Sequence, residues 1–213
     1  MLVEQSFEAF YDEWLVRQQN MLEQLLSVSA MPDSPTKIDH QKMLIEQVLS
    51  HYQEYLEEKS KVANVDVFLL FSPTWLSAYE RALLWIGDYK PSLILRLADG
   101  GVEGLTTEQK QMIEQLTNET KRAEREVSEA MAGVQESVAK PRVVGCSAIE
   151  GLKKPLMGVS EKADNLRAST MRKVVGILSP SQTVQFLSAA THFQLRVKEV
   201  QYAADGPVAF EIE

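Results

Sequence analysis

Residues 107–139 read TEQKQMIEQLTNETKRAEREVSEAMAGVQESVA, and the spacing of the apolar residues in this stretch decides the fold class. Apolar or small residues recur every three or four positions from Ile113 to Val138, which is the period of one helix face. Thr106 followed by Gln109 is a capping-box pattern at the start, and Pro141 follows the end. The stretch predicts one very long helix over residues 106–139.

Helical spacing continues toward the N-terminus. The pattern predicts two long antiparallel helices, over residues 4–28 and 38–61, because their apolar positions alternate spacings of three and four. Ser77 with Glu80 forms a second capping box, for a helix that runs through Trp85 and stops at Gly87. Pro91 begins another short helix.

The C-terminal third of the chain predicts a linker and then two helices. Two prolines and three glycines indicate a mobile linker over residues 140–158. A helix pair follows over residues 159–203, and Ser179, Pro180 and Gln182 supply the cap, first-turn proline and box partner of its second member. Only Val208–Ile212 hints at a strand.

These segments together predict an all-α fold, a multi-helix bundle with one long central helix. We expect residues 1–213 to form a single domain in which residues 4–98 supply the N-terminal helices. The long helix is expected to pack against the N-terminal helix pair, because its apolar stripe needs a partner.

Composition and charge exclude several classes of function. The net charge is −8, which opposes nonspecific binding to phosphate backbones. No apolar run approaches the roughly 20 residues of a membrane span. The single cysteine, Cys146, cannot close an intramolecular disulfide or supply a zinc cage. We therefore expect no membrane association and no metal or redox scaffold.

A search for catalytic and metal-binding patterns finds little. His40 and His51 lie eleven residues apart, which is about 16 Å along a helix and too far to share a metal ion. The sequence GCSAI at residues 145–149 lacks the second glycine of a nucleophile elbow. Gly100, Gly101 and Gly104 precede no lysine of a phosphate-binding loop. No catalytic site and no metal are expected.

Three tryptophans stand out from this background. Trp14, Trp75 and Trp85 fall in or beside apolar stripes. A buried indole usually needs a partner for its N–H group, so each ring is expected to fix a junction between helices.

A second group consists of charged and polar residues inside apolar segments. Glu80 and Arg81 are expected to lie near the tryptophans and to act structurally. At least one of them should form an ion pair with a partner such as Asp164 or Arg167 at the junction of the two helix groups, where these residues and Asn165 interrupt a packed helix.

Longer motifs occur in a fixed order along nearly the whole chain, after an opening helix that carries Phe7, Trp14 and Leu15. They are HYxxY at 51–55, DVFxxxSPTW at 66–75, ERALLWIG at 80–87, LTxEQ at 105–109, ADNLR at 163–167 and ILSPxQ at 177–182. In this order they resemble the Delay of Germination (DOG) domain, a plant-specific helical domain also found at the C-terminus of TGA bZIP transcription factors. The likeness begins at residue 7 and includes no basic region or leucine zipper, so it points to the stand-alone members.

The resemblance implies a non-enzymatic regulatory protein of the nucleus and cytoplasm that acts through protein–protein interaction. The implied processes are seed dormancy, abscisic acid or salt-stress signalling, and transcription regulation. The implied partners are PP2C-type phosphatases and transcriptional co-regulators. Some relatives are associated with haem through histidines in the last helix. Here that helix contains only His192 and no i, i+4 histidine pair, so no cofactor is expected.

Two alternatives stay open beside the docking function. One is a DNA-associated transcriptional regulator, which acts directly or through a TGA-like partner. The other is a helical sensor that holds a small apolar ligand or haem. Direct DNA binding is not expected, because the lysines and arginines of the long helix alternate with glutamates.

Elimination and resemblance together place the docking surface on the long helix and the last helix. The candidate exposed residues are Lys121, Arg125 and Lys198. The heptad seam of the long helix could also support a homodimer.

Overall fold

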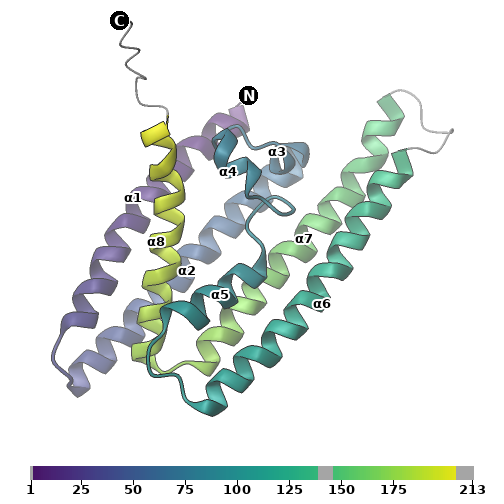
Figure 1. The fold of residues 1–213 in the computed structure, drawn as a ribbon. Coiled ribbons are helices and arrows are strands. Elements are labelled where there is room, and N and C mark those ends of the chain that lie inside the picture. The colour runs from purple at the N-terminus through teal and green to yellow at the C-terminus, as the bar shows by residue number, and fades with distance from the viewer. Residues whose placement is uncertain (1, 139–145, 205–213) are drawn as a thin grey trace, which may run out of the picture.

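The structure is a computed structural model that describes residues 2–138 and 146–204, and the regular elements in this part of the chain are all helices (Figure 1). The all-α prediction is confirmed. In chain order the helices are α1 (Leu2–Ala30), α2 (Pro35–Asp66), α3 (Phe68–Phe71), α4 (Ala78–Ala82), α5 (Pro91–Gly101), α6 (Thr107–Val138), α7 (Cys146–Ile177) and α8 (Pro180–Ala204).

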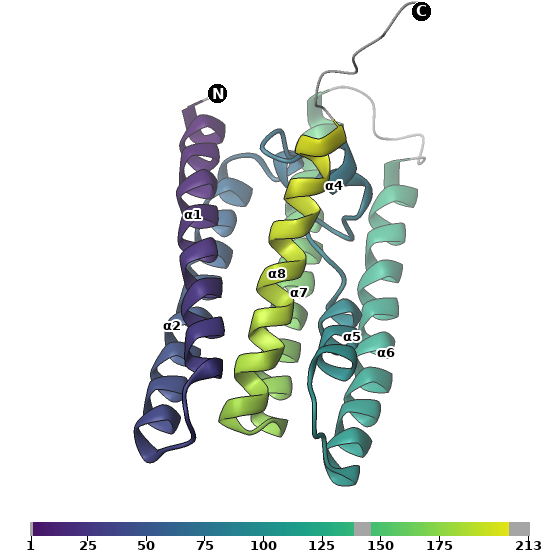
Figure 2. The ribbon, with the colours of Figure 1, turned by 60° about the vertical axis from the view of Figure 1, so that its left-hand side comes forward.

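The long helices stand side by side in two antiparallel pairs (Figures 1 and 2). The α1–α2 pair forms one edge of the bundle, and α6 pairs with α7 at the other. The last helix, α8, packs on α1, α2 and α5, whereas α7 packs on α2, α5 and α6. The central helices are therefore α7 and α8.

The predicted place of the long helix is wrong, because α6 lies at the outer edge and packs mainly on α7 and α5. Its stripe supplies only Ile113 and Leu116 to the main core, and Val127 to a smaller cluster with Val159 and Ala163 of α7. An apolar face this narrow packs against the helices on one side only, whereas a helix at the centre of a bundle needs apolar residues on several sides.

The main core lies where α1, α2, α5, α7 and α8 meet. Fully burying one aliphatic or aromatic side chain contributes roughly 1.5–3 kcal/mol, so this cluster dominates the stability of the fold. Its least exposed members are Leu25, Val48, Leu95, Ala98, Val174, Val184, Phe186 and Leu187. Helices α5 and α8 approach closely here, since a Cβ added at Gly101 would lie 2.9 Å from the Cβ of Ala189.

The three predicted capping boxes are confirmed. Ser77 accepts from the backbone N–H of Glu80, whose carboxylate accepts from the N–H of Ser77 in return. The same reciprocal pair joins Thr106 with Gln109, and Ser179 with Gln182, at distances of 3.0–3.3 Å. These boxes satisfy backbone donors that the first helical turn leaves free.

The predicted linker is wrong for residues 146–158, which form the first turns of α7, with Pro155 inside the helix. Leu156 and Val159 are buried there, and Val159 packs against α6. This tertiary packing outweighs the helix-breaking tendency of one exposed proline and two glycines.

Residues 140–145 of the predicted linker and the possible strand Val208–Ile212 lie outside the described residues. Among the helices of residues 2–138 and 146–204, none has the length and apolar character that crossing a membrane requires.

An aromatic stack joins α1 to α2. Trp14 donates its indole N–H to the carbonyl oxygen of His51 at 3.1 Å, and the two rings lie parallel with centroids 4.5 Å apart. His51 is only 4% exposed, and its Nε2 has no hydrogen-bond partner within the described part of the chain. Burial, with a smaller effect of the Arg17 cation, lowers the pKa of His51 to about 4. This low pKa keeps the histidine neutral at pH 7, although its Nδ1 lies 4.0 Å from Glu54, and its ring holds the two helices by stacking.

We expect acid to destabilise the fold through His51. An unfolded histidine has a pKa of about 6.5, so between pH 6.5 and 4 the unfolded state binds a proton that the folded state excludes. The free energy of unfolding should therefore fall as the pH drops through this window, by about 3 kcal/mol in all. Chemical denaturation at pH 7 and pH 5 measures the part of this loss that falls between the two values, about 2 kcal/mol.

His51→Gln should remove this part of the pH dependence, although it also changes stability at pH 7. His40→Gln is the matched control, because His40 is an exposed histidine of the same helix. Equal pH dependence in the wild type and in His51→Gln would contradict the assignment.

Candidate functional site

A tight turn at residues 85–88 contacts α2, α6 and α7. The backbones of Trp85 and Asp88 exchange hydrogen bonds of 2.7 and 3.4 Å, and the intervening Ile86 and Gly87 have φ angles of +49° and +73°. Two positive φ angles in succession define a type I′ turn, which a glycine favours. A side chain at Gly87 would also come within 3.2 Å of the carbonyl oxygen of Leu70. The predicted helix through Trp85 to Gly87 is therefore wrong, since α4 ends at Ala82 and this turn follows it.

Arg167 of α7 binds this turn through its whole guanidinium group. Its Nε donates to the carbonyl oxygen of Tyr89 at 2.8 Å, and its Nη2 donates to the carbonyl oxygens of Ile86, at 2.9 Å, and of Trp85. The guanidinium also lies 5.4 Å from the centroid of the Trp85 ring. Arg167 is 7% exposed, so these bonds form away from water, where an unpaired charge would be costly.

Two carboxylates and a lysine complete the charged network beneath the turn. Asp164 accepts from Arg167 Nη1 at 2.6 Å and from Lys59 Nζ at 2.8 Å, and Lys59 Nζ lies 3.6 Å from Asp88. Lys59 comes from α2 and is 1% exposed. Burial alone would raise the pKa of Asp88, but the Lys59 and Arg167 cations outweigh it and hold that pKa below its ordinary value. Two cations therefore balance two anions, and the network is internally satisfied.

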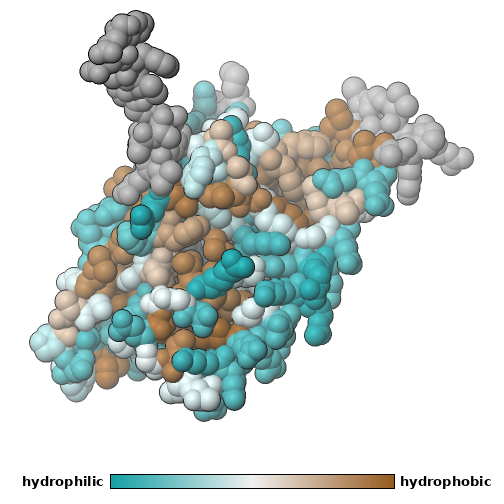
Figure 3. Space-filling model, in the orientation of Figure 1, coloured by the Kyte–Doolittle hydropathy of each residue, from teal (hydrophilic) through white to brown (hydrophobic). Residues whose placement is uncertain are grey.

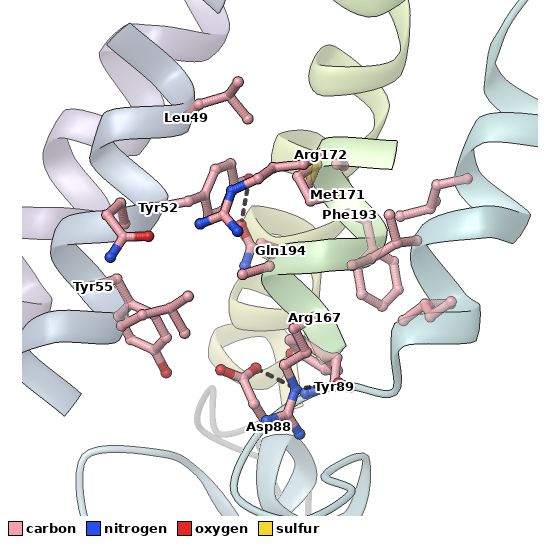
Figure 4. Close-up of a pocket in the computed structure, with 17 residues that line it drawn as sticks. Leu49, Tyr52, Tyr55, Asp88, Tyr89, Arg167, Met171, Arg172, Phe193 and Gln194 are labelled. Atoms are coloured by element: carbon pink, nitrogen blue, oxygen red, sulfur yellow. Dashed lines mark hydrogen bonds between the residues drawn. The ribbon is translucent and has the colours of Figure 1, made fainter. Parts of the chain in front are cut away.

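An apolar cavity of about 180 Å³ adjoins this network, between α2, α5, α7 and α8 (Figure 4). Asp88, Tyr89 and Arg167 lie at one end of the cavity, and Arg172 lies nearer the other. The rest of the lining is mainly apolar and aromatic, and includes Leu49, Tyr52, Tyr55, Leu93, Leu97, Met171 and Phe193.

Burial is the main cause that raises the pKa of each lining tyrosine above its ordinary value. Tyr52, Tyr55 and Tyr89 therefore stay neutral at physiological pH. Tyr52 also donates to Gln194 of α8 at 2.9 Å, so part of the wall is fixed by a hydrogen bond.

The other tryptophans fix junctions as well. Trp75 is buried against Phe7 of α1, with ring centroids 4.6 Å apart. Trp85 donates its indole N–H to Ser128 of α6 at 3.0 Å. Asn165, which the sequence pattern grouped with Asp164 and Arg167, is exposed.

The predicted pairing of Glu80 or Arg81 with Asp164 or Arg167 does not form. Glu80 is buried, caps α4, and pairs with Lys198 of α8 at 3.7 Å. Arg81 is exposed and donates to the carbonyl oxygens of Pro73 and Leu76. The two side chains diverge because successive positions of a helix point in directions about 100° apart.

Lys198 is not an open docking residue. Its side chain is 18% exposed, its Nζ pairs with Glu80, and it lies 5.2 Å from the ring centroid of Tyr11. Lys121 and Arg125 are exposed on α6, at one wall of a polar groove that α6 forms with α5. The structure therefore separates the three predicted docking residues into one interior cation and two surface cations.

Lys59 and Asp88 are the site residues that sequence reasoning missed. Lys59 follows Glu57 and Glu58 in a charged run that looks fully solvated, so the sequence contains no signal of its burial. Asp88 directly follows Gly87, and a type I′ turn at these residues would have placed it beside Trp85.

The histidine ligands that the resemblance associates with haem are not found at the apolar cavity. His192 is exposed on α8, and the lining of the apolar cavity contains no histidine or cysteine. Among the described residues, no three histidine, cysteine or acidic side chains are grouped as metal ligands.

Replacement of Arg167 by lysine should destabilise the protein even though the charge is kept. A lysine has one nitrogen and cannot span the carbonyl oxygens of residues 85, 86 and 89, and each buried carbonyl left without a donor costs about 1–3 kcal/mol. We expect the free energy of unfolding in urea to fall by about 2 kcal/mol or more.

Arg172→Lys on the exposed face of the same helix is the control and should stay within about 0.5 kcal/mol of the wild type. An Arg167→Lys protein as stable as the wild type would show that the turn is held by other contacts.

Comparison with known proteins gives related chains in plants. Residues 18–99 match the family model described as "DOG1: Seed dormancy control". The chain is 37% identical over 217 residues to Protein RESPONSE TO ABA AND SALT 1 of Arabidopsis thaliana, across 92% of this chain and 94% of that protein. It is 35% identical to Protein ZW2 of the same plant, again across 92% of this chain and 96% of the relative.

The longer relatives are transcription factors. Transcription factor TGA7 of Arabidopsis thaliana is 30% identical, in a match that covers 91% of this chain and 55% of that protein. The similarity thus extends over nearly the whole bundle described above. These relatives give the chain a plant regulatory role connected with transcription, and the chain belongs to the DOG1 seed dormancy control family.

Proposed function

We propose that this chain is a non-enzymatic regulator that acts by binding other proteins. The names of its relatives support abscisic acid or salt-stress signalling and seed dormancy as the process. The same bundle matches short proteins almost end to end and about half of a transcription factor. A module that serves proteins of such different length is best explained as a binding platform.

One observation carries this proposal: the buried charges next to the 85–88 turn and the exposed cations Lys121 and Arg125 of α6 differ in their partners. Those of the interior network are paired with one another and hold a turn in place. Lys121 and Arg125 of α6 instead face solvent, with no carboxylate within 4 Å in the described residues. Exposed cations on a protein of net charge −8 offer a distinct surface to a partner.

The partner classes we propose are PP2C-type phosphatases and transcriptional co-regulators, in the nucleus and the cytoplasm. The transcription factor relatives support the nuclear part. We propose that any association with DNA runs through such a partner. A homodimer is proposed as an additional state, and its test is the mass of the purified protein in solution.

Affinity purification of the tagged full chain from seeds treated with abscisic acid, followed by mass spectrometry, tests the docking function. We expect a reproducible set of regulatory proteins, each of which then binds the purified chain directly. Absence of any direct partner would reject the proposal. Turnover of a substrate that is lost in a folded point variant would reject it as well.

The apolar cavity favours a second candidate function, a sensor of a small apolar ligand. Its volume of about 180 Å³ exceeds the ~150 Å³ of an engineered cavity that binds benzene, so a compact apolar molecule fits. Two of the polar groups that line it, Asp88 and Arg167, are already bonded within the network, and Arg172 lies toward the other end. The ligand would therefore be held mainly by apolar contacts.

Native mass spectrometry of protein purified from plant tissue tests this second function. We expect a retained mass on the wild type and its loss in Ala168→Phe, because residue 168 lines the cavity and the larger ring fills it. Ala132→Phe, at an exposed position of α6, should keep the mass. A wild type without any retained ligand would reject the sensor function and leave the docking function unaffected.

A further inference from the structure

A polar groove of about 480 Å³ separates α5 from α6, and we call it the α5–α6 groove. Figure 3 shows hydrophilic side chains along α6 on this face of the molecule. The groove is lined by Leu83, Lys90, Ser92, Leu93, Arg96, Lys121, Glu124, Arg125 and Ser128.

Four cations stand around this groove, two on each side. Lys121 and Arg125 are one helical turn apart on α6, about 6 Å along its axis. Lys90 precedes α5, and Arg96 lies in its second turn. All four are exposed, and no carboxylate of the described residues lies within 4 Å of their charged nitrogens.

The polar groups at the base of the groove already form hydrogen bonds within the protein. Glu124 is 4% exposed, and its carboxylate accepts from the backbone N–H of Ser92 at 2.6 Å, at the start of α5. The hydroxyl of Ser128 donates to the carbonyl oxygen of Glu124 and accepts from the indole N–H of Trp85. A ligand would therefore meet the long cationic side chains of the rim rather than a donor at the base.

Apolar surface lies beside these cations. Leu83 is 42% exposed at the edge of the groove, and Leu93 of α5 also lines it. A partner that matches this lining needs carboxylates at intervals of about one helical turn together with an aliphatic side chain.

We propose that the α5–α6 groove docks an acidic segment of a protein partner, rich in Asp or Glu and carrying a leucine-like anchor. The proposal rests on the docking function above and specifies the chemistry of the partner. Its carboxylates pair with Lys90, Arg96, Lys121 and Arg125, and its anchor lies against Leu83.

The surroundings favour a peptide over a nucleic acid. No aromatic side chain is among the groove residues named above, so bases would have no ring to stack on. Acidic residues also flank the cations on the exposed side of α6, namely Glu119, Glu126 and Glu129. A phosphate backbone that extended beyond the groove would meet these charges.

Fluorescence anisotropy with a labelled synthetic peptide tests the proposal at physiological salt. The probe carries a glutamate at every fourth position with leucines between them, and its control has glutamine in place of each glutamate. We expect the full-length chain to bind the glutamate peptide and not the glutamine peptide. The double variant Lys121→Glu with Arg125→Glu should weaken binding by about tenfold or more, because like charges then face one another.

A charge-matched variant separates the groove from general electrostatics. Arg122→Glu with Lys162→Glu changes the net charge equally, at exposed positions outside the groove, and should alter binding by less than about twofold. Melting temperatures of both variants should match the wild type, since neither pair makes an interior contact.

Three outcomes would overturn the proposal: no binding of the glutamate peptide, equal loss in both double variants, or tighter binding of a single-stranded oligothymidine that the groove variant abolishes. Direct partners from seeds that bind the groove variant as well as the wild type would reject this groove while keeping the docking function. Failure to find any direct partner would reject the docking function itself.

Discussion

The guanidinium of Arg167 is the constraint on which the middle of this bundle depends. This side chain of α7 donates to the carbonyl oxygens of residues 85, 86 and 89 and to Asp164, and its guanidinium lies over the Trp85 ring. The segment has no regular helix of its own between α4 and α5, so its backbone oxygens need an outside donor. Within the same segment, Trp85 donates a hydrogen bond to Ser128 of α6, and Asp88 forms an ion pair with Lys59 of α2. A single cation thereby fixes how α2, α6 and α7 meet at this turn.

Local signals in the sequence predict local structure well. The capping boxes mark the starts of α4, α6 and α8 correctly, because they depend on neighbours within a turn. The position of α6 in the bundle depends instead on tertiary packing. Its apolar stripe supplies fewer residues to the main core than the stripes of other helices do, and the sequence does not show which stripes meet in that core. The first turns of α7 were missed for a related reason, since their packing against α6 outweighs Pro155.

The site was partly predictable. Its arginine, aspartate and glycine belong to motifs that stand out, so Gly87, Asp164 and Arg167 were identified before their partners were known. Lys59 was not identified, because a lysine next to glutamates is usually exposed. Its burial depends on Asp164, a carboxylate far along the chain. Lys198 shows the same limit, since exposure of a long side chain depends on whether another helix offers a carboxylate. The sequence thus reveals which residue types matter, while the fold decides which of them stay in solvent.

The spacing of the network along the chain has a consequence for synthesis. Lys59 lies 105 residues before Asp164, and the turn carbonyls lie 78–82 residues before Arg167. At a typical 5–20 residues per second, the ribosome finishes α5 roughly 3–13 seconds before it adds the arginine that locks the turn. During that interval the turn has no donor and Lys59 has only Asp88 as a partner carboxylate. The first half of the nascent chain therefore stays without this lock until α7 emerges, and α8, which supplies Val184, Phe186 and Leu187 to the main core, follows last.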